Sequence, residues 1–462
     1  MHLSLARDRA AIDEVLLRTM QEAQRLLAGL DTRPVAVAPG TPAPASAPER
    51  GVGFTGALQA FTDRYADGFS GSAGPRYLGF VTGGATPAAL AGDWLTATLD
   101  NSPITRLDSV GADLEQETIG WLAHALGLQG FTGTFVSGAT MSNVVGLAIG
   151  REWVAEQAGV SVADDGLQAI PPIAVLSGAA HSTIAKALSI LGLGRSSLTA
   201  VPCLAGREAV DIAALERALD ARRGRPCIVV ANAGTVNTAD FDDITAIAAL
   251  RERFAFWLHV DAAFGAFAAL SPDLAPLVAG MAQADSVCVD AHKWLNVPYD
   301  SAMQFTRHRD LQVRVFHNNA AYLGGPTDDP DPVHLTPESS RRLRALPAWF
   351  TLQAYGIEGH REIVERDVRL ARALGERIRE STAFTLLADV RLNVACFTLA
   401  GDGSQPAVQR FVNALRDGGA TFMTPTVLSG RPGVRAAFSN WRTGDDDVEI
   451  VWGAMRDAAA RT

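Results

Sequence analysis

Lysine is scarce in this sequence. The chain has 40 lysine and arginine residues together, and only Lys186 and Lys293 among them are lysine. A guanidinium stays protonated in proteins, whereas a buried lysine can lose its proton and attack a carbonyl carbon. Arginine could therefore replace a surface lysine, but not a lysine that forms an imine. We expect Lys293, which follows a short apolar strand, to form a Schiff base with a cofactor, and Lys186, in mid-helix, to be a surface residue.

Three further features that the sequence lacks limit the classes of protein to which it could belong. Basic residues do not outnumber acidic ones, since the net charge is -10 and the pI is near 5.4, which argues against a nucleic-acid partner bound through its phosphates. No apolar run is long enough for a signal peptide or for a membrane span of about 20 residues, so we predict a cytoplasmic protein. The four cysteines lie far apart without a CxxC pair, which favours reduced thiols over disulfides or a metal site.

The chain is longer than one hydrophobic core usually organises, and its composition changes along its length. Residues 1–73 favour a helical arm followed by a linker, because 33–50 are rich in Pro, Ala and Ser. Residues 74–325 alternate short apolar runs with helical stretches and are expected to form a large domain. Residues 326–462 are expected to contain a lid loop, a connecting helix at 341–380 and a smaller α+β domain.

Within the large domain, strands are expected at 134–137, 173–177, 227–231, 257–261 and 286–290. Strands that are apolar throughout and joined by helices indicate a parallel sheet covered on both faces. Ligands of such sheets bind at the carboxyl ends of the strands. The polar residues that follow each strand are therefore the candidate site.

Two of these strand ends suit a phosphate and a flat ring. Residues 137–143 (SGATMSN) join a strand to a helix, where a phosphate could dock on free N–H groups, although Ser and Thr there are equally suited to capping the helix. His181, at the start of the next helix, could stack on an aromatic ligand or move protons, or it could simply cap that helix.

The other three strand ends carry a threonine, a carboxylate and the lysine. Thr235 either positions a ligand or belongs to a loop whose aspartates, at 240–243, cap the next helix. Asp261 ends a strand that should be buried, and a buried carboxylate needs a cationic partner such as a protonated pyridine nitrogen. Asp290 and His292 precede Lys293. Together these groups make up the set that pyridoxal phosphate requires.

Three motifs resemble those of the group II pyridoxal-phosphate decarboxylases, the family of the aromatic amino acid, glutamate, histidine and diaminobutyrate decarboxylases. DAHKW (290–294) resembles its cofactor-lysine motif, HVDAA (259–263) its carboxylate motif, and PRYLGF (75–80) its substrate-pocket segment. The resemblance runs from about residue 76 to the C-terminus. It implies the type I fold of the α/β class, with a mainly parallel seven-stranded sheet between helices, a smaller C-terminal α+β domain and an N-terminal helical segment.

The resemblance also implies a role for each candidate residue. Lys293 would bind pyridoxal 5'-phosphate covalently, Asp261 would pair with its ring nitrogen, and His181 would stack on the ring. Further contacts with the phosphate and the ring would come from Gly138, Ala139, Thr140, Thr235, Ala263, Asp290 and His292. Phe80 and Val81 would contact the substrate, which favours an amino acid with an apolar or aromatic side chain. Such enzymes are homodimers with the active site at the subunit interface.

The sequence departs from this family in the lid loop. The family protonates the reacting carbon with a tyrosine shortly before an Arg-Arg pair, here Arg341–Arg342, but residues 324–340 (GGPTDDPDPVHLTPESS) contain no tyrosine. Tyr322 lies before the glycines. His334 is the nearest group able to carry a proton, unless it is only a solvated loop histidine.

We therefore expect decarboxylation of an L-amino acid to an amine and carbon dioxide, with Lys293, His181, Asp261 and His334 as the catalytic residues. The missing lid tyrosine leaves other reactions of the same cofactor open, namely aldehyde-forming oxidative decarboxylation and deamination, transamination, or retro-aldol cleavage. A non-catalytic scaffold with the same fold is the remaining alternative.

Overall fold

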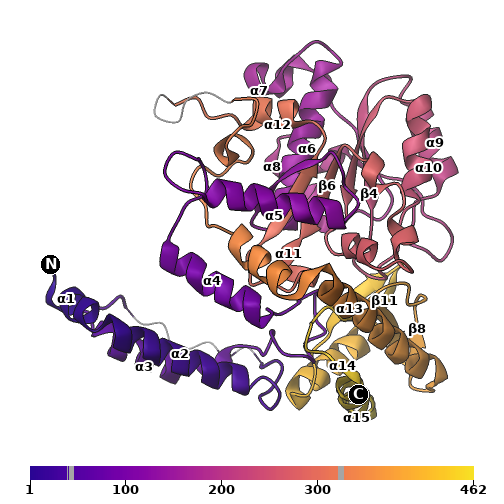
Figure 1. Cartoon of the computed structure of the whole chain (residues 1–462). Coiled ribbons are helices and arrows are strands. Elements are labelled where there is room, and N and C mark those ends of the chain that lie inside the picture. The colour runs from indigo at the N-terminus through magenta and orange to yellow at the C-terminus, as the bar shows by residue number, and fades with distance from the viewer. Residues whose placement is uncertain (39, 41–45, 321–326, 462) are drawn as a thin grey trace.

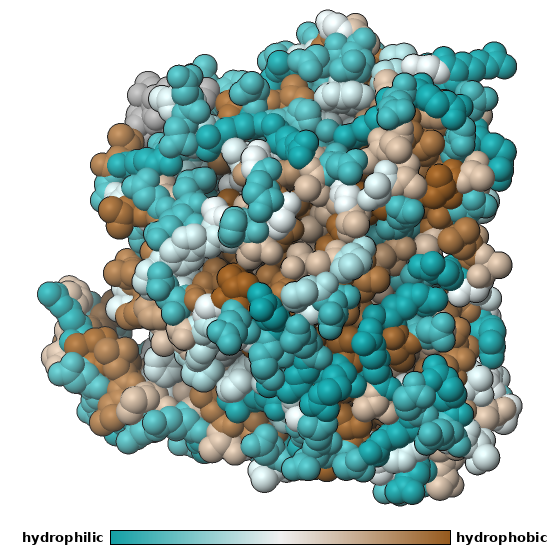
Figure 2. Space-filling view, turned by 45° about the vertical axis from the view of Figure 1, so that its right-hand side comes forward, coloured by the Kyte–Doolittle hydropathy of each residue, from teal (hydrophilic) through white to brown (hydrophobic). Residues whose placement is uncertain are grey.

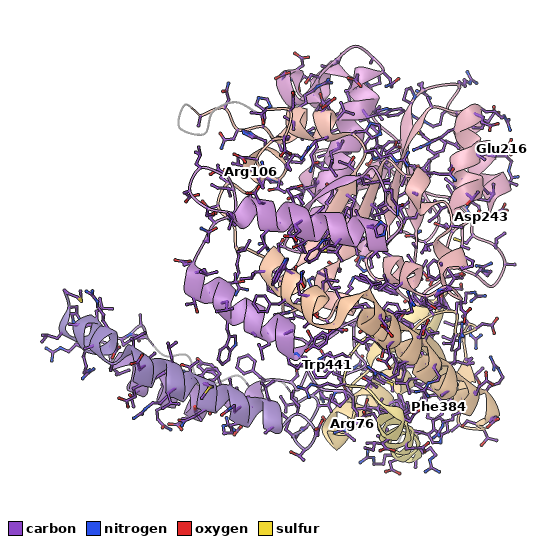
Figure 3. The ribbon with its side chains drawn as sticks, viewed as in Figure 1. Arg76, Arg106, Glu216, Asp243, Phe384 and Trp441 are labelled. Carbon is purple, nitrogen blue, oxygen red and sulfur yellow. The ribbon has the colours of Figure 1, made fainter. Side chains whose placement is uncertain are left out.

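The structure, a computed structural model, describes residues 1–38, 40, 46–320 and 327–461. At its start, α1 (Leu3–Ala10), α2 (Ile12–Ala28) and α3 (Gly53–Arg64) form an arm that projects from the rest of the molecule (Figure 1). None of the residues of these three helices is buried. Arg76 fixes the base of the arm, because its guanidinium donates to Asp31 O (2.6 Å) and pairs with Asp447 Oδ1 (2.9 Å; Figure 3).

A seven-stranded sheet forms the centre of the molecule. Its strands are β1 (Thr132–Val136), β2 (Val175–Ser177), β3 (Leu198–Ala200), β4 (Cys227–Asn232), β5 (Phe256–Asp261), β6 (Ser286–Asp290) and β7 (Ala302–Thr306). They lie in the order β1-β7-β6-β5-β4-β2-β3. All neighbouring pairs are parallel except those of β7, which runs antiparallel to β1 and β6. The predicted mainly parallel sheet of seven strands is confirmed.

The antiparallel strand β7 was not predicted, and neither was the short strand β3. Only residues 291–301 separate β6 from β7, which is too little chain for the helical crossover that a parallel neighbour requires. The same short connection carries the predicted cofactor lysine. The reversal of chain direction at β7 therefore keeps Lys293 at the end of β6, where the carboxyl ends of the parallel strands meet.

Helices cover both faces of this sheet (Figure 1). They are α4 (Pro87–Leu99), α5 (Gly111–Ala125), α6 (Ala139–Glu156), α7 (Val162–Asp165), α8 (Ser182–Ile190), α9 (Ile212–Asp220), α10 (Ile244–Ala249), α11 (Ala291–Trp294) and α12 (Arg309–Phe316). Most residues of α6 are buried, because this helix crosses β5, β6 and β7. Within the described parts of the chain, no helix is long and apolar enough to cross a membrane.

A second, four-stranded sheet lies at the C-terminal side. After α13 (Ala345–Glu380) come β8 (Phe384–Leu386), β9 (Val394–Leu399), α14 (Gln405–Gly418), β10 (Thr424–Leu428), β11 (Arg431–Ala437) and α15 (Asp445–Ala460). The strands pair antiparallel in the order β10-β11-β9-β8. Phe384 (labelled in Figure 3) packs against Phe397 and Phe411, both at 5.6 Å between ring centroids. This is the predicted smaller α+β region; the division of the chain at residues 73 and 325 remains a proposal.

Candidate active site

A cavity of about 320 Å³ lies at the carboxyl ends of β4 and β5, beside the start of α6 and α8. It brings together residues that are up to 355 positions apart in the sequence, from Phe80 to Arg435. The predicted site residues that line it are Phe80, Val81, Ala139, His181, Thr235, Asp261, Ala263 and Lys293. Residues predicted at several different strand ends thus meet in one cavity.

Lys293 enters this cavity from α11, the single helical turn after β6. Its Nζ lies 2.7 Å from Asp290 Oδ2, and its side chain is 21% exposed. Burial alone would lower the pKa of Lys293, but the charge and hydrogen bond of Asp290, together with the charge of Asp261, hold that pKa above its usual value. The amine is therefore protonated in this arrangement, and Asp290 is the acceptor that faces it.

The predicted phosphate cradle is the N-terminus of α6. Asp290 Oδ1 accepts a hydrogen bond from Ala139 N (2.6 Å), so this carboxylate links the lysine to a position where helices bind anions. His292 covers the Gly138 side of the cradle: a Cβ on that glycine would lie 3.4 Å from His292 Cε1. Thr140 is half-buried in the first turn. Gly138, Thr140, Asp290 and His292 thus lie beside the cavity and do not line it.

Asp261 lies at the end of β5 and is 6% exposed. Its Oδ2 accepts from Asn143 Nδ2 (3.0 Å) and its Oδ1 from Ala263 N (3.3 Å). Of the arginines, lysines and histidines that the structure describes, none forms an ion pair with it. A buried carboxylate on a cavity wall without such a partner suits a ligand that brings its own positive charge, and the protonated ring nitrogen of pyridoxal phosphate fits this requirement.

His181 caps α8 and also lines the cavity. As the N-cap of α8, its Nδ1 accepts from Thr183 N (3.3 Å) and lies 2.8 Å from Thr183 Oγ1. Its ring also lines the cavity. Burial lowers the pKa of His181, and the positive charge of Lys293 lowers it further against the opposing effect of Asp261. A neutral imidazole with a fixed ring is therefore available beside the carboxylate.

The loop after β4 likewise caps a helix and lines the cavity. Asp243 caps α10 by accepting from Ala246 N (2.9 Å), while Thr235 lines the cavity and donates from Oγ1 to Glu208 Oε2 (2.7 Å). Arg435 of β11 reaches the same cavity from the smaller sheet, where its guanidinium donates to Val236 O and to Thr424 Oγ1. The cavity therefore lies between the two sheets.

The structure does not place His334 at this cavity. It lies in the turn Pro332–His334, is 2% exposed, and accepts from Asn318 N at Nδ1 (3.1 Å). The alternative of a solvated loop histidine is wrong as well, because the ring is buried. Tyr322 and residues 324–326 of the lid lie outside the described residues.

A cavity residue that the sequence did not point to is Tyr299. Its hydroxyl lies 3.3 Å from Thr82 Oγ1, and its ring packs on His292 with 4.4 Å between centroids. Among the described tyrosines it is the one that lines the cavity. Only its position six residues after Lys293, on the short return to β7, could have indicated this.

The comparisons with known proteins agree with this geometry. The pyridoxal-dependent decarboxylase conserved domain matches residues 42–400, so the match begins and ends earlier than the expected span. An aromatic-L-amino-acid decarboxylase from Bacillus atrophaeus is 25% identical over 389 residues, covering 81% of this chain and 79% of that protein. A 3,4-dihydroxyphenylacetaldehyde synthase from Drosophila melanogaster is 30% identical over 238 residues, covering 50% and 46%.

A solved structure extends the agreement to the fold. The crystal structure of Oryza sativa TDC with PLP and tryptamine superposes with a TM-score of 0.90 at 22% identity, over 99% of this chain and 98% of that one. The predicted type I fold is thereby confirmed. The chain belongs to the pyridoxal-dependent decarboxylase family and is a carboxy-lyase that uses pyridoxal phosphate.

Proposed function

We propose that the chain converts an L-amino acid with an apolar or aromatic side chain into the amine and carbon dioxide. The observation that carries this proposal is the buried Asp261, which faces the same cavity as Lys293 and forms an ion pair with none of the cationic side chains that the structure describes. Phe80 and Val81 give the cavity an apolar wall. The similarity to an aromatic-L-amino-acid decarboxylase favours the same substrate class.

Each residue acts on the bound cofactor or on the substrate. Pyridoxal phosphate supplies an electron sink for the bond that breaks at the substrate Cα. Lys293 would hold the cofactor through its amine. Asp261 would keep the ring nitrogen protonated, since an opposite charge a few ångströms away stabilises the charged form. His181 would hold the ring in a fixed orientation relative to the substrate.

The test is product analysis with phenylalanine, tyrosine, tryptophan and leucine as substrates. Carbon dioxide and amine should form in equal amounts with at least one of them. A separate measurement, light scattering, should give the protein twice the mass of one chain. Aldehyde and hydrogen peroxide in place of amine would move the function to the second candidate, an aldehyde-forming reaction. Two observations favour that candidate: residues 324–340 have no tyrosine, and part of the chain is similar to a 3,4-dihydroxyphenylacetaldehyde synthase.

A proton must replace the carboxyl group if the product is an amine, and we assign its delivery to Tyr299. The bond between Cα and the carboxyl carbon would break, carbon dioxide would leave, and the electron sink of the cofactor would take up the bonding pair until a proton reaches Cα. The Tyr299 O–H bond then breaks as a C–H bond forms at Cα. Water restores the phenol proton through the Thr82 hydroxyl, which lies 3.3 Å from Tyr299 Oη. Tyr299 is 57% exposed, so water reaches it.

Tyr299→Phe is expected to lower the rate of amine formation by about a hundredfold, since a positioned general acid contributes about 10²- to 10⁴-fold. The fraction of substrate released as aldehyde should rise. His334→Gln is the matched control and should change both quantities less than about twofold, because His334 does not line the cavity. If the His334 variant lost amine formation while the Tyr299 variant kept it, the proton donor would have to be assigned to the lid loop instead of Tyr299.

We also propose that the protein is a homodimer whose arm packs on a second copy. The arm exposes many large apolar side chains, and Figure 2 shows them gathered at its lower left. They include Leu3, Leu5, Ile12, Leu16 and Leu17. An exposed apolar stripe on a projecting helix is typical of an interface. A single-chain mass in solution would contradict this proposal.

The cytoplasmic location remains a prediction.

A further inference from the structure

Asp261 is the end of a hydrogen-bond chain that runs between β5 and α6. Asn143 Nδ2 donates to Asp261 Oδ2 (3.0 Å), and Asn143 Oδ1 lies 2.8 Å from His259 Nε2. On its other side, His259 Nδ1 lies 2.7 Å from Ser286 Oγ, which accepts from Trp257 Nε1 (3.1 Å). Asn143, His259, Ser286 and Trp257 are fully buried. Water therefore does not compete for any of these bonds.

The donors in this chain point in one direction, toward Asp261. The Asn143 amide nitrogen can only donate, so its oxygen must accept from His259 Nε2, which then carries the proton. Burial lowers the pKa of His259 to about 4, so the ring is neutral and its Nδ1 has a free lone pair. Ser286 must therefore donate to Nδ1 while it accepts from the indole N–H.

The same asparagine also reaches the imidazole on the cavity wall. Asn143 Nδ2 lies 3.2 Å from Thr183 Oγ1, which in turn lies 2.8 Å from His181 Nδ1. The second amide hydrogen of Asn143 is thus donated to Thr183, and the Thr183 hydroxyl donates to His181. One buried side chain thereby fixes both the carboxylate and the imidazole that line the cavity.

Two glycines of α6 leave room for these hydrogen-bonded side chains. Trp257, His259 and Asp261 alternate along β5 and face α6, while Asn143, Gly146 and Gly150 lie on one face of that helix. A Cβ at Gly146 would lie 2.7 Å from His259 Cε1, and one at Gly150 would lie 2.7 Å from Trp257 Cδ1. Glycine in a helix interior destabilises it relative to alanine. The close approach of the imidazole and the indole explains why these positions hold glycine.

We propose that Asn143 is a positioning residue that aims Asp261 and His181 at the cofactor ring, and that His259 and Ser286 set the direction of its amide. If Ser286 could not donate, His259 could shift its proton to Nδ1. The Asn143 amide would then turn over and present its oxygen to Asp261. This inference rests on the proposed pairing of Asp261 with the ring nitrogen.

The test compares two ligands on the apoenzyme: pyridoxal phosphate, and its analogue with carbon in place of the ring nitrogen. The ratio of their affinities, measured by absorbance titration, reports how well Asp261 meets the nitrogen. Asn143→Leu should reduce this ratio about tenfold, because a hydrogen bond to a charged group is lost. Ser286→Ala should reduce it about threefold. Thr118→Val is the control, because it removes another buried hydroxyl, one that donates to Leu114 O (2.7 Å) within α5 and takes no part in this hydrogen-bond chain.

The outcomes separate this inference from the proposed function. A wild-type protein that binds both ligands equally well would remove the proposed role of Asp261, and the inference with it. A wild-type preference for the natural cofactor that survives in both variants would overturn the inference alone. A purely structural defect would weaken both ligands equally and leave the ratio unchanged, which also overturns it. If Asn143→Leu does not fold, Ser286→Ala decides by the same ratio.

Discussion

Lys293→Ala is expected to lower kcat by at least about a thousandfold, because the variant loses the nucleophilic amine that holds the cofactor. Among the described residues that line the cavity, no other carries an amine. Borohydride should fix pyridoxal phosphate to the wild-type chain and leave the variant unlabelled. The cofactor should still bind the variant, more weakly, through its phosphate and ring contacts, and remain removable by dialysis.

The composition of the chain makes this experiment unusually clean. Lys186 is the one other lysine in the sequence, and it is exposed on α8. Lys186→Ala should leave the rate and the borohydride label unchanged. Peptide mapping then has three possible sites to distinguish: Lys293, Lys186 and the N-terminal amine. A label on Lys186 in the Lys293 variant would overturn the assignment, and the predicted role of Lys293 would fall with it.

The sequence predicted five of the seven strands, β1, β2, β4, β5 and β6, together with the polar residues that follow them, for a physical reason. A parallel strand that is covered on both faces is apolar along its length, so polar side chains gather where it ends. Asp261 and His181 follow directly from this rule. Their assignment to the ring nitrogen and the ring face needed the family resemblance, because spacing in the sequence does not fix the distance between two strand ends.

Asn143 shows where such reasoning stops. It belongs to the loop and helix start that suits a phosphate, yet it is directed toward β5 and not toward the cradle. Asn143 lies one turn after Ala139 on nearly the same face of α6, so its side chain meets a neighbour about 6 Å further along the helix axis. Which neighbour it meets depends on how α6 crosses the sheet. That crossing is set by tertiary packing.

Tyr299 was not predicted as a cavity residue, for a related reason. The sequence search for an acid followed the lid loop, because the resemblance located the family's tyrosine there. The hydroxyl that lines the cavity comes instead from the return between α11 and β7, a connection whose path depends on the antiparallel β7. Residue composition does not show that a strand reverses direction, so neither the antiparallel strand β7 nor the position of Tyr299 beside it could be predicted.

Asp261→Asn is expected to lower kcat by about a hundredfold to a thousandfold, the range found when one preorganised charge or hydrogen-bond partner of the reacting group is removed. The neutral amide can still accept from Asn143, so the fold should survive. What it cannot do is stabilise a positive charge on the ring nitrogen. The absorbance of the bound cofactor should shift accordingly, and the Lys293 label with borohydride should persist.

Asp367→Asn is the matched control for that variant, because the same atoms change in another buried carboxyl group, one that does not line the cavity. Asp367 is also fully buried, and it accepts from Trp294 Nε1 (2.8 Å). Burial raises the pKa of Asp367 well above its usual value, with the Trp294 hydrogen bond acting against it. Burial thus disfavours the charged form of Asp367, and an amide in its place keeps the oxygen that accepts from the indole. Its kcat should stay within about twofold of the wild type. Equal losses in the two variants would mean that buried amides disturb the fold generally, and the electrostatic role of Asp261 would have to be abandoned.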